Sequence, residues 1–500
     1  MRTSLKCALV AATSSAAMMA SAAQAQNEIV IGIPSTLNTL DPAQTKIGEE
    51  YLVNFLAFDG LTEMSVEMEV QPSLAESWEA NDDLTEWTFT LRDDVRFHDG
   101  EPLTADDVIA TIERIKEPDL ASTARVNFLI IDAMEAEDDH TVRFELSESY
   151  AGFPELFADR QVRIIPAHDV DGLTEQPIGT GPLVFESFDP GDRVVLTRND
   201  DYHVEGETEI DRVVLRIIPE TASRMTALDN AEIDMVWDLP LDQIEQADAM
   251  DGVTVDAVAT SSWDGLIMNN SEPPFDDMRV RKAIQLAIDH DEVVEIALFG
   301  YGEPTHTPIS PASPQFNHDL GFDGPDLERA LDLMAEAGHA DGFEITLYLP
   351  DGRANRERLG IAAQQILRPL GIDVSLQRVP WDQFISEIEG QAAFFTTGFY
   401  SRPTTDTSVY PWYHSSGSWN DQLWHYANDE MDELLDEARR TEDAEARDEL
   451  YMEFQRLAQD TVPSVVPYVL QHANAYRDRV EGFQSSPMMW IDLRTVTLAD

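Results

Sequence analysis

The segment between residues 345 and 379 constrains the fold more than any other part of the chain. Its pattern predicts a buried strand over residues 345–349, a helix that ends at Gly371, and a second strand over residues 372–379. The helix is marked by apolar residues at helical spacing, namely Leu359, Ala363, Ile366, Leu367 and Leu370. Strand, helix and strand within about 35 residues form a βαβ unit, whose two strands are parallel. We therefore expect an α/β fold with at least one parallel sheet, which binds ligands at the carboxyl ends of its strands.

The other periodic segments are shorter and alternate between strand and helix. Apolar or alternating runs predict strands over residues 29–33, 87–91, 142–146, 194–196 and 213–218. Helices are predicted after Thr104, after Pro273-Pro274 and from Leu327, and again around residues 431–438 and 450–458. Residues 300–325 are rich in Pro and Gly and predict a long loop.

The composition limits the size and the partners of the protein. A chain of 500 residues is long enough for about three folding units. Lys and Arg total 33 against 95 Asp and Glu, so the net charge is -62, which repels nucleic acids and anionic lipids. Only four of the basic residues are lysines, and we interpret this acidic surface as an adaptation to high salt, which screens self-repulsion. The alternative is a surface that collects cations, but the acidic residues are dispersed along the chain.

The sequence contains no recognisable reactive motif. Cys7 is the single cysteine, which excludes a disulfide framework and a multi-cysteine metal or iron–sulfur site. The G-x-S-x-G, G-x-x-x-x-G-K and H-E-x-x-H patterns are also missing from the sequence. We therefore expect no catalytic residues, no cofactor and no bound metal.

Residues 1–25 have the pattern of a secretory signal peptide. Arg2 and Lys6 supply a positive start, residues 8–23 carry no charge, and Ala23-Gln24-Ala25 is a small-residue cleavage site. No other run approaches the length of a membrane-spanning segment. We expect a soluble exported protein located in the periplasm.

One segment is unusually aromatic. Residues 394–426 contain ten aromatic side chains where the average composition predicts about three, namely Phe394, Phe395, Phe399, Tyr400, Tyr410, Trp412, Tyr413, Trp419, Trp424 and Tyr426. The segment shows no clear periodicity after Phe399, so we expect aromatic loops that follow a buried strand. Such loops suit the lining of a solute pocket, because flat rings desolvate a ligand with little loss of entropy. The alternative is that these rings form ordinary core.

Several motifs, in order and spacing, resemble the family 5 extracellular solute-binding proteins, the peptide/nickel-type receptors of ABC importers. The resemblance covers nearly the whole chain after the signal peptide. It rests on the stretches at residues 40–42 (LDP), 72–78 (PSLAESW), 95–100 (VRFHDG), 103–108 (LTADDV), 177–182 (PIGTGP), 269–270 (NN) and 280–284 (VRKAI). The turn Phe97-His98-Asp99-Gly100 lies between a strand and a capped helix, which gives it a structural role.

Membership would imply a type II periplasmic-binding-protein clamshell, with two lobes of mixed and parallel sheets joined by a hinge and an extra domain inserted in lobe I. We place lobe I at residues 27–65, 178–268 and 478–500, the extra domain at 66–177, and lobe II at 269–477. The ligand would lie between the lobes and would stabilise the closed state.

The resemblance also suggests which residues contact the ligand. Similar peptide-binding members hold the peptide ammonium with an aspartate shortly after a Gly-Trp pair. Here Gly398-Phe399 replaces that pair, Arg402 stands at the expected acidic position, and Asp406 follows. This departure weakens the case for an ordinary free-amine peptide. Arg402 would suit a carboxylate or phosphate, although a surface ion pair is the alternative.

Five further candidates complete the predicted site. Arg353 resembles the position that anchors a peptide carboxylate in some members, and Trp263 is a candidate wall just before the crossing to lobe II. Three residues of the aromatic segment, Tyr400, Trp412 and Trp419, are the other candidate walls.

The predicted function is solute capture without chemistry. We expect a periplasmic monomer that takes up a peptide or peptide-like small polar solute and delivers it to an ABC permease. The alternatives are a receptor for a non-peptide anionic or opine-like solute, and a sensory or chaperone-like binding protein. A secreted hydrolase would need a nucleophile–base pair, which the sequence does not reveal.

Overall fold

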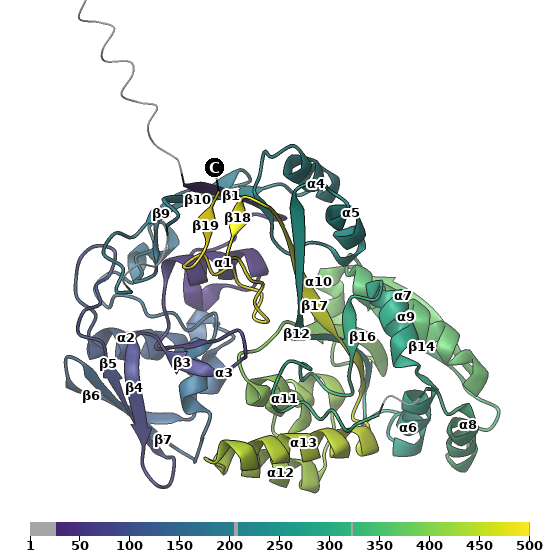
Figure 1. The fold of residues 1–500 in the computed structure, drawn as a ribbon. Helices are drawn as coiled ribbons and strands as arrows, with labels where there is room; N and C mark the ends of the chain where they lie inside the picture. The colour runs from purple at the N-terminus through teal and green to yellow at the C-terminus, as the bar shows by residue number, and fades with distance from the viewer. Residues whose placement is uncertain (1–26, 205–208, 322–323, 500) are drawn as a thin grey trace, which may run out of the picture.

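Two long antiparallel strands, β12 (Val253–Met268) and β17 (Val465–Arg477), run through the middle of the molecule and belong to both of its lobes (Figure 1). The structure is a computed structural model that describes residues 27–204, 209–321 and 324–499, so the predicted signal peptide lies outside the described residues. The main sheet has eleven strands in the order β15-β14-β16-β12-β17-β11-β1-β10-β9-β8, with β13 also paired to β17. The two long strands are therefore the centre of one continuous sheet.

Lobe I is built on one side of these strands. Its sheet contains β1 (Glu28–Ile33), β8 (Leu183–Asp189), β9 (Arg193–Arg198), β10 (Arg212–Ile217) and β11 (Met235–Val236). Strand β1 pairs in parallel with both β10 and β11, whereas β8, β9 and β10 form an antiparallel meander. Its helices are α1 (Gly48–Ala57), α4 (Thr221–Asp229) and α5 (Ile244–Asp248), and a two-stranded ribbon near the carboxyl end pairs β18 (Val480–Glu481) with β19 (Thr497–Leu498).

Lobe II contains the predicted βαβ unit, which the structure confirms. Strand β14 (Phe343–Pro350), helix α9 (Ala354–Ile366) and strand β15 (Ile372–Val379) follow one another, and the two strands pair in parallel along their whole length. Gly371 ends the connection in the left-handed conformation at φ 76°. Strand β16 (Phe394–Phe399) then joins β14 to β12, and β13 (Gly302–Pro304) adds to β17 within the long loop. The remaining helices surround this sheet: α6 (Met278–Ala287), α7 (His290–Leu298), α8 (Leu327–Glu336), α10 (Trp381–Gln383), α11 (Thr405–Tyr413), α12 (Asp429–Arg440) and α13 (Ala444–Thr461).

A separate four-stranded antiparallel sheet lies within the segment that we predicted to be the extra domain. Its order is β4 (Ala75–Ala80), β5 (Glu86–Leu91), β7 (Thr141–Leu146) and β6 (Ile131–Asp138), with α2 (Ala105–Lys116) and α3 (Arg125–Phe128) packed on it. A short ribbon of β2 (Thr62–Met64) and β3 (Val70–Pro72) precedes it. In Figure 1 this sheet lies at the lower left, facing the helices of lobe II.

The motifs that resemble the family join these parts together. His98 holds residues 179–181 through both ring nitrogens, since Nδ1 accepts from the Gly179 N–H at 3.3 Å and Nε2 lies 3.0 Å from the Gly181 carbonyl. Gly179 packs directly on helix α1, where an added Cβ would lie 2.0 Å from the Ala57 carbonyl oxygen. Glycine is therefore required for this close approach of two backbones. The role of the His98 turn is structural, as predicted.

One element was predicted incorrectly. The segment after Phe399 was expected to be loop, but residues 405–413 form helix α11. The Thr404 hydroxyl accepts from the Thr407 N–H at 3.1 Å and caps this helix, which continues through Pro411. The apolar pattern hid the helix because Trp412 and Tyr413 are buried together with Val409, so no polar face alternates clearly with them.

We predict that the aromatic core of the extra domain supplies much of its stability. Phe89 is fully buried, with ring centroids 5.5 Å from Phe144 and 5.2 Å from Phe157. The substitution Phe89→Ala should lower the free energy of unfolding by about 3–5 kcal/mol, because it leaves a cavity among these rings. Denaturant unfolding monitored by circular dichroism measures the change.

Val126→Ala is the matched control in the same domain, because Val126 is 49% exposed on α3. It should change the free energy of unfolding by less than about 0.5 kcal/mol. Equal losses for the two variants would contradict the assignment of this core.

Candidate functional site

An irregularity in β12 places serine hydroxyls at the centre of the molecule. The pairing of β12 with β17 jumps from Ala259 opposite Gln471 to Trp263 opposite Val469, so β12 contains two extra residues at this point. The bulge turns Ser261 and Ser262 toward the segment that follows β16. Ser261 Oγ lies 2.7 Å from Ser401 Oγ, and Ser262 Oγ accepts from the Ser401 N–H at 2.8 Å. The bulge therefore fixes the backbone that carries the predicted ligand residues.

Arg402 follows directly and is held by the same bulge. Its backbone N–H donates to Ser261 Oγ at 3.2 Å, while its side chain lines a cavity between the lobes. From the lobe I side, buried Arg160 reaches across and donates through Nη2 to the Ser401 carbonyl oxygen. The Arg160 guanidinium also lies 4.6 Å above the ring of Tyr51 on α1. Arg160 thus contacts the residue directly before Arg402, so two arginines from different parts of the chain meet at the same backbone segment.

The Asp406 carboxylate accepts several hydrogen bonds where the lobes meet. It accepts two hydrogen bonds from Arg439, each at 2.9 Å, and one from the Tyr150 hydroxyl at 2.9 Å. Tyr451 contributes another hydroxyl at 3.4 Å. Burial and, next, the Asp406 charge raise the pKa of Tyr150, so this hydroxyl remains protonated and donates. Asp406 thus already has a cationic partner within the chain.

Two more contacts join the lobes beside Asp406. The Ala151 N–H donates to the Arg439 carbonyl oxygen at 2.7 Å, and Glu155 lies 3.8 Å from Arg447 on α13. Burial raises the pKa of Glu155 to about 7, although the Arg447 charge opposes the shift. Glu155 therefore titrates near neutral pH at a contact between the extra domain and lobe II.

These residues surround a narrow cavity of about 60 Å³. Both lobes and the long loop contribute side chains to its wall, including Tyr150, Glu155, Ser261, Gln315, Arg402, Asp406 and Arg447. A second cavity of about 210 Å³ lies within lobe I, between α1, β2 and the carboxyl-terminal segment. Of the seven predicted site residues, Arg402 and Asp406 line the first cavity, and none lines the second.

The predicted aromatic walls pack mainly against one another. Trp263 is 2% and Trp412 1% exposed, and their ring centroids are 6.1 Å apart. Trp419 is only partly buried and stacks on Trp412 with an interplanar angle of 9°. The indole N–H of Trp412 has no hydrogen-bond partner among the described residues. Trp263 and Trp412 therefore form a buried layer that packs under the candidate site, and Trp419 lies nearer to the surface.

The other two predicted residues are exposed. Tyr400 has 46% of its surface accessible, and it directly precedes the serine that the β12 bulge holds. Arg353 occupies the N-cap position of α9 without a side-chain capping bond, and its guanidinium lies 4.3 Å above the ring of Trp381. Both side chains remain able to contact a solute.

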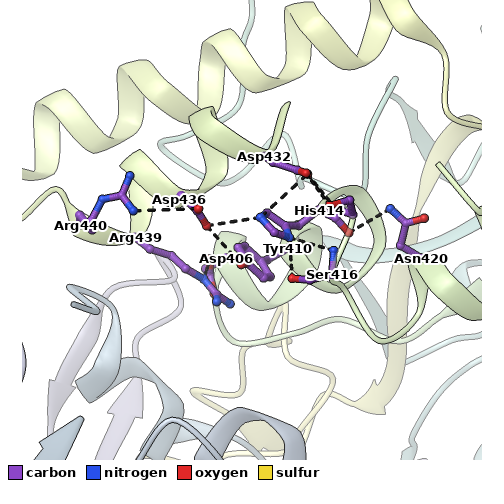
Figure 2. Close-up of polar contacts among 10 residues, drawn as sticks. Asp406, Tyr410, His414, Ser416, Asn420, Asp432, Asp436, Arg439 and Arg440 are labelled. Carbon is purple, nitrogen blue, oxygen red and sulfur yellow. Dashed lines mark hydrogen bonds and ion pairs between the residues drawn. The ribbon is translucent and has the colours of Figure 1, made fainter. Parts of the chain in front are cut away.

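A hydroxyl, an imidazole and a carboxylate meet at the carboxyl end of α11, as Figure 2 shows. Ser416 Oγ lies 2.8 Å from His414 Nδ1, and His414 Nε2 lies 3.4 Å from Asp436. The same Nδ1 already accepts the Ser416 backbone N–H at 3.1 Å, so its lone pair is engaged in a local turn. The ring also stacks on Tyr410 at 4.3 Å, and Tyr410 bonds Asp436. The arrangement fits a role in docking α11 on α12 and not in activating a nucleophile.

Sequence reasoning missed the partners that come from distant segments. Arg160 and Tyr150 lie about 250 residues from Ser401 and Asp406, which they contact. The available signal was the set of four charged residues among the apolar residues of 153–165, where an arginine is expected to need a specific partner. Within the described part of the chain, no group of three or more His, Cys, Asp and Glu side chains is placed to hold a metal ion. No helix there is both long and apolar enough to span a bilayer.

Comparison with known proteins agrees with this geometry. The family model of bacterial extracellular solute-binding proteins, family 5, matches residues 69–420. The chain is 29% identical to the probable D,D-dipeptide-binding periplasmic protein DdpA of Escherichia coli K12, covering 94% of each. It is 27% identical to the glutathione-binding protein GsiB of Pectobacterium atrosepticum, covering 96% of each. The structure of HbpA2 from Haemophilus parasuis superposes with a TM-score of 0.84 at 25% identity, over 95% of this chain and 100% of that one. The type II clamshell is thereby confirmed.

We predict that Asp406 is needed for stability, because its carboxylate balances Arg439. Asp406→Asn leaves a largely buried guanidinium without its counter-charge and should lower the free energy of unfolding by about 3 kcal/mol. Denaturant unfolding measures the loss. Asp200→Asn is the control, since that side chain is 81% exposed in its ion pair with Arg198 and should change stability by less than about 0.5 kcal/mol. An unchanged stability for Asp406→Asn would contradict this role.

A second prediction concerns Glu155 and pH. Because the folded-state pKa is raised, the folded protein binds the Glu155 proton more tightly than the unfolded chain does. The bound Glu155 proton adds to the free energy of unfolding. This contribution is complete below the ordinary pKa of a glutamate and is lost as the pH rises through about 7. Relative to Glu155→Gln, the wild type should therefore be equally stable at pH 4.5 and less stable at pH 8, by up to about 3 kcal/mol. Unfolding both proteins at the two pH values tests this, and a difference that does not depend on pH would refute it.

Proposed function

The chain belongs to the bacterial extracellular solute-binding proteins of family 5, and on that premise we propose that it is the periplasmic receptor of an ABC importer. It captures a peptide or peptide-like small polar solute between its lobes and delivers it to the permease. Its relatives carry the names of dipeptide-binding and glutathione-binding proteins, which are compounds of this class.

The observation that carries the proposal is the convergence of polar groups from both lobes on the β12 bulge. Ser261 and Arg402 on one side and Arg160 on the other lie where the two lobes meet. A solute seated there would contact both lobes at once and would stabilise the closed arrangement, which is how such a receptor reports that it is loaded.

We propose that Tyr400, Trp419, Arg353 and Arg402 contact the solute directly. Trp263 and Trp412 form the packed layer that holds these residues in position, and Asp406 joins the lobes through Tyr150 and Arg439. This division follows mainly from exposure, since the residues of the first group have accessible surface or face the cavity, whereas Trp263, Trp412 and Asp406 are buried.

Three finer features belong to the proposal as well. The protein is exported by residues 1–25, works as a monomer, and carries an acidic surface suited to high salt. It releases its solute unchanged. Hydrolysis of model peptides that persists on repurification and disappears in Ser416→Ala would instead favour the hydrolase alternative.

The decisive experiment combines ligand identification with a measurement of closure. Native mass spectrometry of protein purified from its own periplasm identifies the retained solute, and small-angle scattering follows the radius of gyration as that solute is titrated. We expect a peptide-like compound and a more compact molecule. A protein that no peptide-like compound makes more compact would contradict the proposed function.

We also predict that two aromatic substitutions affect different properties, one the binding of solute and the other the stability of the fold. Tyr400→Ala should weaken solute binding by about tenfold and leave the melting temperature unchanged, because its ring is 46% exposed. Trp412→Ala should lower the free energy of unfolding by about 3–5 kcal/mol, because it empties a packed position. Calorimetry and thermal unfolding distinguish the two effects, and the reverse pattern would contradict the division of the site.

A further inference from the structure

Two arginines from opposite lobes meet at the site without a carboxylate partner. Within the described residues, no Asp or Glu oxygen lies within 4 Å of the guanidinium of Arg160 or of Arg402. Arg160 is 3% exposed, makes one hydrogen bond to the Ser401 carbonyl, and has no partner for its Nε. The side chain of Arg402 forms no hydrogen bond with any described residue, and it faces the cavity.

Among the described residues, several enclosed arginines are paired with oxygen acceptors, although Arg163 and Arg224 also lack a carboxylate and keep an unpartnered Nε. Arg439 and Arg356 hold carboxylates, and Arg281 donates to three backbone carbonyls. With 95 acidic residues against 33 basic ones, a missing carboxylate at a pair of enclosed arginines is not explained by scarcity. What distinguishes Arg160 and Arg402 is that they lie at the same backbone segment, and two neighbouring cations without a counter-ion favour an anion from outside the chain.

The positive charges of Arg160 and Arg402 repel each other across the contact between the lobes. Burial and, next, the positive charge of Arg160 lower the pKa of Arg402, whereas the negative charge of Asp159 acts in the opposite direction. Asp159 acts from beyond ion-pair distance, and its Oδ1 already accepts the Gln161 N–H at 2.9 Å. Arg160 belongs to the lobe I side and Arg402 to lobe II, so closing the lobes brings like charges together.

We propose that Arg160 and Arg402 form a carboxylate site shared by the two lobes, at which an acidic group of the solute neutralises both guanidiniums and permits closure. The inference rests on the proposed function and specifies its substrate class: the solute carries a carboxylate, and that carboxylate binds beside residue 402. In the empty protein, repulsion between the two arginines favours the open state. A solute without an acidic group leaves this repulsion in place and is rejected.

The first test needs no ligand. Spin labels on the two lobes report the interlobe distance by double electron–electron resonance in the wild type, Arg402→Gln, Arg402→Lys and Arg329→Gln. Arg402→Gln removes one of the two charges and should raise the closed population of the empty protein by about fivefold. Arg402→Lys keeps the charge, and Arg329→Gln removes an exposed charge that pairs with Glu336, so both should match the wild type. An unchanged population in Arg402→Gln would overturn the proposal, and thermal unfolding of each variant confirms that it is folded.

The second test uses matched probes. Calorimetry compares alanyl-alanine and glutathione with the alanyl-alanine amide and the glutathione dimethyl ester, which differ only in their carboxylates. We expect the acids to bind at least about a hundredfold more tightly to the wild type, and this preference to disappear in Arg402→Gln. Equal binding of acid and amide, or a preference that survives in Arg402→Gln, would overturn the carboxylate site.

The two tests separate this inference from the proposed function. If neither acids nor amides bind and the retained solute is not peptide-like, the assignment of the solute class fails, while the distance measurement still decides whether the arginines oppose closure. If peptides bind and only their ammonium group matters, the proposed function stands and the carboxylate site fails.

Discussion

The antiparallel pairing of β12 with β17 is the constraint on which the rest of the structure depends. These strands of 16 and 13 residues carry the main sheet from one lobe to the other, so each lobe is added to a common pair of strands. The bulge near Ser261 lies within this pair, and it is the point at which the backbone of residues 401–402 is attached. The candidate site is therefore part of the connection between the lobes, and in the proposed receptor this connection would couple solute binding to closure.

Electrostatics then decides what each polar group does. Asp406 is surrounded by donors from Tyr150, Tyr451 and Arg439, and it acts as a bond between the lobes. Among the residues that the structure describes, Arg160 and Arg402 have no carboxylate partner at the same interface. A chain with this excess of acid could have paired them, so their isolation is the clearest electrostatic feature of the site.

Local patterns predicted the parts of the fold that depend on neighbours in sequence. The β14-α9-β15 unit followed from apolar spacing and from Gly371, because helix and strand periods are local properties. Helix α11 was missed, since its buried rings leave no polar face to define a period. The sequence also indicated Arg402 as unusual, but its neighbour Arg160 and the pairing of Asp406 with Arg439 could not be predicted. These contacts depend on how the lobes meet, and a single sequence contains no local signal of that meeting.

The position of the bulge has a mechanical consequence. The proposed closure would bend the two adjacent strands that carry the main sheet from one lobe to the other, and the bulge near Ser261 lies within this pair. Glu155, Arg439 and Arg447 line the same cavity as Ser261, so the contacts of Ala151 with Arg439 and of Glu155 with Arg447 lie close to the bend. A solute seated in that cavity would therefore touch the bending strand and the contacts that join the lobes at the same time.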